Sequence, residues 1–359
     1  MSLGRAKFAL ALCAAVSATC IAFPARAESS SWFGGSETPA DKPKVAPAKP
    51  AAAKTTAGKP ASASDIKKIV PASVPAGGDD PAYLAFDQGQ YLTALKLAEE
   101  AAGRGEPQAN TLIARIYAEG LGVGRDEKAA VNWYTRGAEA GDVPAMFALG
   151  LMLAEGRGVE KNRVAAAQMF EKAALTGHAE ANYNLGVLFL KGDGKPENPS
   201  RAFQHIRYAA EKGIPQAQYD LAALYQTGSG VEPNAVETAR WLSRAAAQGH
   251  AAAEYDYAVL LLKGFGLTKD EPKAIALMKS AAGKGIAGAQ NRLAYIHFEG
   301  VGVDKSPVEG AKWRLIAAKN GVEDKTLDDR VAKLSKSELQ KAQAAASEWS
   351  DRIQLEPVE

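Results

Sequence analysis

Residues 105–320 repeat one pattern of apolar, small and polar positions every 36 residues. A glycine marks this interval most clearly, at Gly105, Gly141, Gly177, Gly213, Gly249, Gly285 and Gly321. A sequence that resembles itself at a fixed period of about 20 to 50 residues is typical of a repeat protein. Because the spacing runs through six units without insertion or deletion, each unit is expected to adopt the same structure.

The apolar positions predict two helices in each unit. In the first helix, a large apolar column precedes a column of small residues, which allow helices to approach closely. The large column comprises Ile113, Leu149, Leu185, Leu221, Tyr257 and Leu293. The small column comprises Ala114, Gly150, Gly186, Ala222, Ala258 and Ala294. The second helix carries a column of mostly large residues at Trp133, Met169, His205, Trp241, Leu277 and Trp313.

Polar and glycine columns predict where these helices end. The Gly120 column ends the first helix, and the Gly141 column ends the second. A third column holds residues that favour the position before a helix, where the side chain accepts from free backbone N–H groups. Its members are Asp126, Asn162, Asn198, Asn234, Asp270 and Ser306.

The stretches "ANYNLGVLFLKGDG" (181–194) and "AQYDLAALYQTGSGVEPN" (217–234) resemble the Sel1-like repeat family, a relative of the tetratricopeptide repeats. The resemblance covers about residues 105–320. It implies an all-α fold: an α/α solenoid of six 36-residue Sel1-like helix-turn-helix repeats with atypical N- and C-terminal capping helices. It also implies a role in protein interaction.

Both ends of the array depart from the unit, as the ends of a solenoid must. Residues 81–104 predict an N-terminal tetratricopeptide-like half repeat, or cap. Residues 321–359 predict C-terminal capping helices and a tail. There, Ser335 and Glu338 form a capping box before an apolar stripe of Leu339, Ala342, Ala346, Trp349 and Ile353.

Residues 1–27 predict a signal peptide, with a basic start, a short apolar stretch and cleavage after Ala27. Both cysteines, Cys13 and Cys20, lie inside it, so the exported chain is expected to lack cysteine. Residues 28–80 are rich in proline, alanine and lysine and predict a disordered linker. We therefore expect a periplasmic protein. Retention of the signal as a membrane anchor, or secretion, remains the alternative.

Candidate chemistry is sparse. The glycine-rich loop 120–124 follows a helix rather than a strand, and Gly124 is not repeated, so we expect a helix end rather than a phosphate site. The four histidines occupy repeat columns and do not stand at metal-ligand spacing. We therefore expect no cofactor, no metal and no enzymatic activity. With a net charge of only +2, we expect no nucleic-acid partner, and we expect no stable membrane insertion after signal cleavage.

The candidate binding residues lie on the first helices of three successive units. A tyrosine column flanked by Asn or Asp is expected to hold an extended peptide in a groove on the concave face. Its members are Tyr183, Asn184, Tyr219, Asp220, Tyr255 and Asp256. Tyrosine belongs to the repeat pattern here, so packing between repeats is the alternative.

We accordingly expect a non-enzymatic scaffold or adaptor that binds a protein or peptide. The resemblance suggests the periplasmic domain of a sensor kinase, or a cell-wall complex, as the partner. Two other classes remain open. One is an enzyme acting on cell-wall or β-lactam substrates, which the cysteine-free chain disfavours. The other is a secreted or surface effector that binds host proteins.

Overall fold

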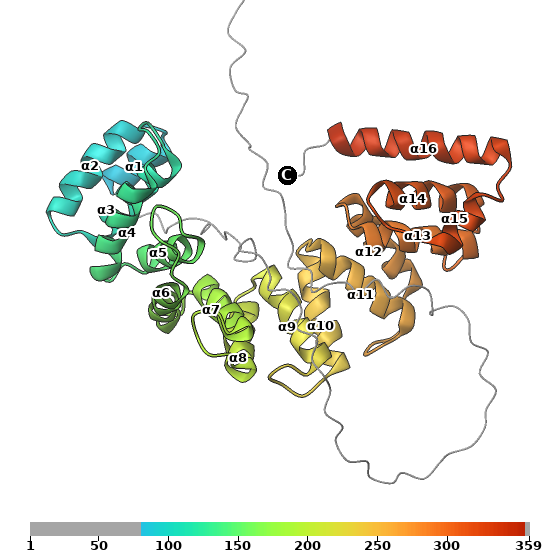
Figure 1. The fold of residues 1–359 in the computed structure, drawn as a ribbon, viewed down its shortest axis with the longest axis horizontal. Helices are drawn as coiled ribbons and strands as arrows, with labels where there is room; N and C mark the ends of the chain where they lie inside the picture. The colour runs from blue at the N-terminus through green and yellow to red at the C-terminus, as the bar shows by residue number, and fades with distance from the viewer. Residues whose placement is uncertain (1–79, 356–359) are drawn as a thin grey trace, which may run out of the picture. The chain divides into compact units, whose positions relative to one another are not determined.

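The computed structural model describes residues 80–355, so the expected signal peptide and nearly all of the expected linker lie outside it. Sixteen helices and no strand occur within the described part of the chain (Figure 1). The expected all-α solenoid of six repeats is confirmed.

Each repeat contains two helices of 13 residues, here named helix A and helix B. The helix A elements are α3 (Pro107–Glu119), α5 (Val143–Glu155), α7 (Ala179–Lys191), α9 (Pro215–Thr227), α11 (Ala251–Lys263) and α13 (Ala287–Glu299). The helix B elements are α4 (Glu127–Glu139), α6 (Arg163–Leu175), α8 (Pro199–Glu211), α10 (Ala235–Ala247), α12 (Glu271–Gly283) and α14 (Pro307–Lys319). Four further helices, α1 (Pro81–Asp87), α2 (Tyr91–Gly103), α15 (Lys325–Val331) and α16 (Lys336–Leu355), flank the repeats.

The helix ends lie where the polar and glycine columns predict them. All six residues of the Asp126 column accept hydrogen bonds from backbone N–H groups in the first turn of helix B. The glycines of the Gly120 column end helix A in the left-handed conformation, with φ between 65° and 78°. The loop between the helices is closed by a backbone bond, as in the first repeat, where the Asp126 N–H donates to the Tyr117 carbonyl at 2.9 Å.

The small column on helix A exists because a large side chain of helix B lies directly against it. A Cβ added to Gly150 would meet the Phe170 ring at 2.7 Å, and one added to Gly186 would meet Ile206 at 2.7 Å. Both of these helix B side chains are fully buried. The core therefore lies between successive helices, and alanine and glycine set how closely the helices approach.

The second glycine of each loop meets the repeat before it. A Cβ on Gly194 would lie 2.3 Å from the carbonyl oxygen of Arg163, the first residue of the preceding helix B. The same approach occurs at Gly158, Gly230 and Gly266, with separations of 2.1 to 2.2 Å. These glycines thus let the loop backbone rest on the backbone of the neighbouring repeat.

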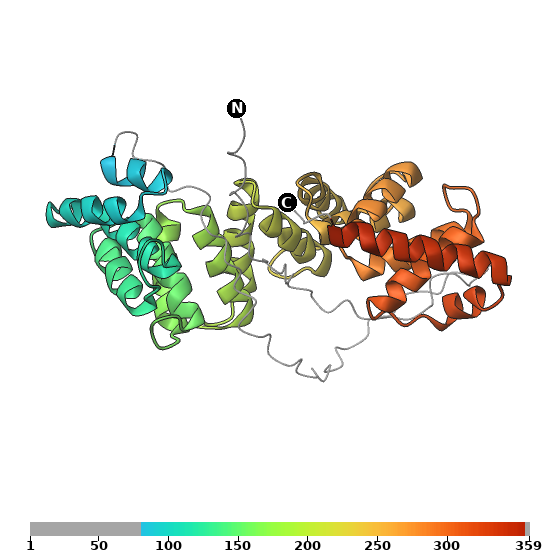
Figure 2. The ribbon, with the colours of Figure 1, turned by 90° about the horizontal axis from the view of Figure 1, so that it is seen from above.

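The C-terminal end is closed by α16, which packs along α14 (Figures 1 and 2). Ala342 is fully buried there, and the Trp349 ring meets the Trp313 ring edge-on at 5.3 Å. The expected capping box is present. The Ser335 N–H donates to Glu338 Oε2 at 2.9 Å, and the Glu338 N–H donates to Ser335 Oγ at 3.3 Å. The side chain of Ile353 lies outside the described residues.

At the N-terminal end, α1 and α2 cover the first repeat through buried Tyr83, Phe86 and Leu95. None of the helices within residues 80–355 is long and apolar enough to cross a membrane.

Two glycine substitutions separate the backbone approach from conformational strain alone. Gly194 and Gly213 both have positive φ, but a Cβ at Gly213 would meet nothing within 4 Å. Gly213→Ala should cost about 1–2 kcal/mol, the penalty for left-handed backbone. Gly194→Ala should cost about 2–5 kcal/mol, because overpacking against the Arg163 carbonyl is added. Urea unfolding followed by circular dichroism measures both, and equal losses would contradict the packing role.

Candidate functional site

The tyrosine and aspartate residues expected in the groove join successive helix A elements. Tyr183 of α7 donates its hydroxyl to Asp220 Oδ2 of α9 at 2.8 Å. Tyr219 of α9 does the same to Asp256 Oδ2 of α11 at 2.9 Å. Each tyrosine therefore reaches the residue 37 positions later, across the boundary between two repeats.

Burial divides the six candidate residues into two groups. Tyr183, Asn184 and Asp220 are buried, with exposed fractions of 1%, 2% and 6%. Asn184 and Asp220, which a groove on the surface would expose, are instead covered by neighbouring parts of the array. Tyr219, Tyr255 and Asp256 are half-buried and keep some contact with solvent. A ligand-binding role for the six residues stays a prediction.

Two histidines flank the same face and begin helix A elements. His178 Nδ1 accepts from the Ala181 N–H at 3.2 Å, and His250 Nδ1 accepts from the Ala253 N–H at 3.2 Å. The His250 ring also stacks on Tyr219, with 4.8 Å between ring centroids. Burial lowers the pKa of His178, and nearby Glu180 offsets this only partly, so its ring favours the neutral form that can accept.

A buried polar column next to the tyrosines escaped the sequence analysis. Asn182, Gln218 and Gln290 each donate a side-chain amide N–H to the carbonyl eight residues earlier, at the end of the preceding helix B. The donor–acceptor distances are 3.3, 3.1 and 3.0 Å. The sequence carried a signal for two of these amides, since "ANYN" and "AQYD" place Asn182 and Gln218 directly before Tyr183 and Tyr219. Each of these carbonyls also accepts a backbone N–H from the turn that follows helix B, so the amide adds a second bond that ties the next helix A to this turn.

Charged groups surround the exposed part of the face. Burial raises the pKa of Asp256, and the hydrogen bond from Tyr219 lowers it to a smaller extent. Burial likewise raises the pKa of Tyr255, while the neighbouring Arg292 guanidinium opposes that shift. Burial and Arg292 both lower the pKa of Lys263. The arrangement offers aromatic edges and charges of both signs, which suits recognition of a polar peptide more than bond making.

Sequence comparison decides the family. The Sel1 repeat family matches residues 107–142, 143–178, 179–214, 215–250, 251–286 and 287–322, which together span more than half of the chain. The chain belongs to the Sel1 repeat family. No curated protein matches its sequence.

Solved Sel1 repeat structures agree with this assignment. A Sel1 repeat protein from Oxalobacter formigenes is 30% identical with a TM-score of 0.59, and the match covers 67% of this chain and 97% of that one. The protein c5321, a protective antigen of uropathogenic Escherichia coli with the same repeat fold, is 26% identical with a TM-score of 0.54. That match covers 75% of this chain and 68% of the other. Sel1 repeat proteins are generally non-catalytic scaffolds that mediate contacts between proteins.

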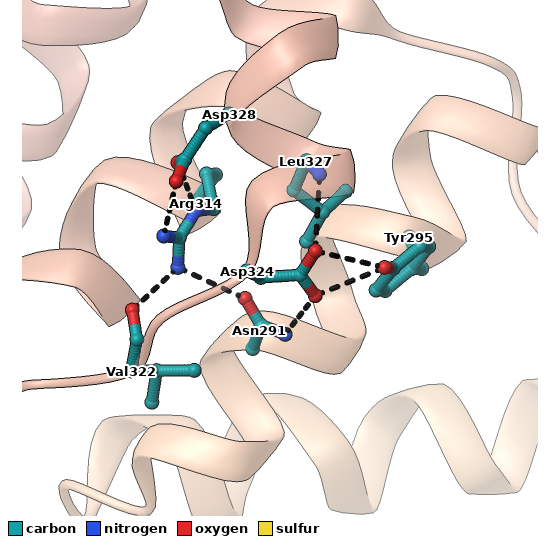
Figure 3. Close-up of polar contacts among 7 residues, drawn as sticks. All are labelled: Asn291, Tyr295, Arg314, Val322, Asp324, Leu327 and Asp328. Carbon is teal, nitrogen blue, oxygen red and sulfur yellow. Dashed lines mark hydrogen bonds and ion pairs between the residues drawn. The ribbon is translucent and has the colours of Figure 1, made fainter. Parts of the chain in front are cut away.

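The last Sel1 repeat ends the ladder with a different set of polar bonds (Figure 3). Asn291 occupies the tyrosine position of this repeat and donates to Asp324 Oδ2 at 2.9 Å, and Tyr295 also donates to Asp324. Asp324 caps α15 by accepting from the Leu327 N–H at 3.1 Å. Buried Arg314 joins the same cluster through both carboxylate oxygens of Asp328, at 2.6 and 3.0 Å (Figure 3).

This C-terminal cluster is stabilised by ionised Asp324. Burial raises the pKa of Asp324, but hydrogen bonds from Asn291, Leu327 and Tyr295 outweigh burial and hold it below the ordinary 3.8. Because the folded-state pKa is lowered, the carboxylate contributes stability above pH 3.8, and this contribution is lost as the pH falls below that value.

No group of three or more His, Cys, Asp or Glu side chains that would suit a metal ion is found within the described chain.

The repeats supply a natural test of the tyrosine–aspartate bond. Phe147 and Asn184 occupy the positions that Tyr183 and Asp220 occupy one repeat later. Tyr183→Phe should lower the free energy of unfolding by about 1–3 kcal/mol, because buried Asp220 loses a donor. The double variant Tyr183→Phe, Asp220→Asn recreates the earlier pair and should recover most of that loss in urea unfolding. A double variant no more stable than the single one would contradict a specific bond.

The C-terminal cluster predicts a local effect. Asp324→Ala removes the α15 cap and an acceptor for Asn291 and Tyr295, so amide exchange in α15 and α16 should accelerate about tenfold or more at pH 7. Exchange in α3 to α8 should stay unchanged, because a repeat contacts only its neighbours. Hydrogen exchange with mass spectrometry resolves the two regions, and uniform acceleration along the chain would contradict a local cap.

Proposed function

We propose that the protein is a non-enzymatic periplasmic scaffold that binds a protein or peptide on the concave face formed by its helix A elements. The unbroken array of six Sel1 repeats carries this proposal, because it places six helix A elements in sequence along one face. Repeat arrays use such extended faces to hold partners.

The rim of the tyrosine–aspartate ladder provides the contacts. Tyr219, Tyr255 and Asp256 keep exposed edges, whereas buried Tyr183 and Asn184 support the face from below. Tyrosine combines an apolar ring with a polar tip and loses little conformational entropy on binding. Exposed Lys263 stands seven residues after Asp256 on the same side of α11, so the rim carries both charges.

The two N-terminal segments support the proposed location of the protein. Residues 1–27 act as the signal peptide and 28–80 as a spacer that separates the repeats from the processed end. The partner we favour is the periplasmic domain of a sensor kinase or a component of a cell-wall complex. Because the related c5321 is a protective antigen, exposure at the cell surface is the competing location.

Site-specific photocrosslinking tests the binding face. A photoreactive amino acid replaces Thr227 or Lys263, which are exposed positions on the ladder side of α9 and α11. The matched control probes replace Gln204 of α8 and Ala276 of α12, which are exposed and occupy equivalent positions in two helix B elements. In living cells, the helix A probes should capture a discrete envelope protein and the helix B probes should not.

The same cells test the location. The mature chain should be released with the periplasmic fraction and begin at Glu28, as read by N-terminal sequencing. Capture through the helix B probes alone would overturn the assignment of the binding face. Resistance to periplasmic release, with an intact N-terminus, would overturn the assignment to the periplasm.

A further inference from the structure

A second surface lies away from the helix A ladder, where the fourth and fifth repeats meet. Two adjoining cavities of about 650 and 400 Å³ open to solvent there. They share Tyr257 of α11 and Leu267 of the following loop. One extends along the start of α12 and the other along α10. We call the combined feature the outer groove, and its size falls within the range of about 300–1,000 Å³ typical of binding sites.

Exposed apolar side chains flank the outer groove. Val236, which lines it, is 62% exposed, and Phe265, which directly precedes Gly266 in its wall, is 53% exposed. They are two of only six large hydrophobic side chains that are exposed in the described part of the chain. The loop is held firmly, since Gly266 rests on the Ala235 carbonyl. Solvent-facing apolar groups gathered at a rigid hollow are typical of a contact surface.

The repeat pattern does not require Tyr257, Phe265 or Lys273 at their positions. Tyr257 stands in a column that is otherwise Ile or Leu, and Phe265 is the one aromatic residue in a column that otherwise reads Leu121, Arg157, Asp193, Ser229 and Val301. Lys273 stands three residues after the helix B cap, where both adjacent repeats carry a glutamate, Glu237 and Glu309, and the third repeat carries Arg201. The fifth repeat therefore differs from both adjacent repeats at three positions, of which Tyr257 and Lys273 line the outer groove and Phe265 directly precedes its lining residue Gly266.

Charge indicates what the outer groove binds. Exposed Arg240, Arg244, Lys269 and Lys273 line it. Two acidic residues, Asp270 and Glu271, also line the groove, so the four cations outnumber them, and these two and nearby Glu237 contact other groups of the protein. Glu237 pairs with Arg240 at 3.1 Å, Asp270 accepts the Lys273 N–H at 3.0 Å, and Glu271 lies against the loop at Gly302.

Three of these cationic side chains have no carboxylate partner within the described residues and can pair with one from another molecule. Within residues 80–355, no carboxylate forms an ion pair with Arg244, Lys269 or Lys273. Two of them lie over aromatic rings instead, Arg244 at 4.6 Å from the Trp241 centroid and Lys273 at 5.3 Å from the Tyr257 centroid. A ligand with carboxylates around one large apolar side chain complements both features.

We propose that the outer groove binds a short acidic segment of a partner protein, with one aromatic or large aliphatic side chain seated against Tyr257 and Leu267. The carboxylates of that segment pair with Arg244, Lys269 and Lys273. The surface is separate from the helix A ladder, so the protein would hold two partner segments or two parts of one partner.

Peptide arrays read by fluorescence polarisation test this proposal with the full chain. The probes are labelled peptides Gly-Glu-Asp-X-Glu-Asp-Gly, in which X is Phe, Trp, Leu or Ser, and matched peptides with Lys in place of each acid. The acidic Phe, Trp or Leu peptides should bind saturably, at least tenfold more tightly than the Ser peptide and the basic set. Equal binding of the Ser peptide, or no saturable binding by any acidic peptide, would overturn the proposal.

Variants place the binding on the outer groove. Lys269→Glu with Lys273→Glu should weaken binding at least tenfold, and the fold should tolerate the second change because Glu237 and Glu309 occupy equivalent positions. The matched control is Lys161→Glu with Lys305→Glu, which makes the same charge change at the equivalents of Lys269 in other repeats. An equal loss in this control would show general charge attraction and refute the site.

A second variant removes the aromatic wall without removing charge. Tyr257→Leu restores the residue found at Leu221 and Leu293 and should therefore keep the fold, which thermal unfolding verifies. Binding of the Phe peptide should fall several-fold while binding of the Ser peptide stays the same. Unchanged binding of the Phe peptide would overturn the proposed seat. Failure of either variant test leaves photocrosslinking at Thr227 and Lys263 unaffected, since neither position lines the outer groove.

Discussion

The close backbone approach between repeats is the constraint on which the rest of the structure depends. At Gly158, Gly194, Gly230 and Gly266 the loop lies so near the preceding helix B carbonyl that no side chain fits between them. One insertion or deletion inside a unit would move the glycine off that contact. The strict 36-residue period therefore follows from one packing geometry that is repeated along the chain.

Directional hydrogen bonds made by side chains supplement this apolar and backbone packing. The amides of Asn182, Gln218 and Gln290 hold helix A to the end of the preceding helix B. The tyrosine–aspartate bonds then tie one helix A to the next. Buried groups of this kind are costly unless every partner is present, so they favour one register over its alternatives. Under the same requirement, only the partly exposed members, such as Tyr219 and Asp256, have surface that a ligand could contact in addition.

Departures from the repeat carry information that the repeat cannot. Positions shared by all units build the array, because each must meet the same neighbour. Tyr257 and Lys273 are not shared, and the structure brings both to the lining of one cavity. A scaffold built from identical units needs such differences in order to distinguish one part of its surface from another.

The sequence by itself determined the fold, its period and its helix ends, because these depend on local rules that act within one unit. Asp126 and its equivalents cap helices wherever they stand, and Gly120 ends one for the same reason. Sequence could not decide whether Tyr183 and Asp220 face a ligand or the core, since burial depends on the helix one repeat away. It also missed the amide column and the outer groove. Both are made by residues that lie close together only after neighbouring repeats stack, and that contact belongs to the tertiary structure alone.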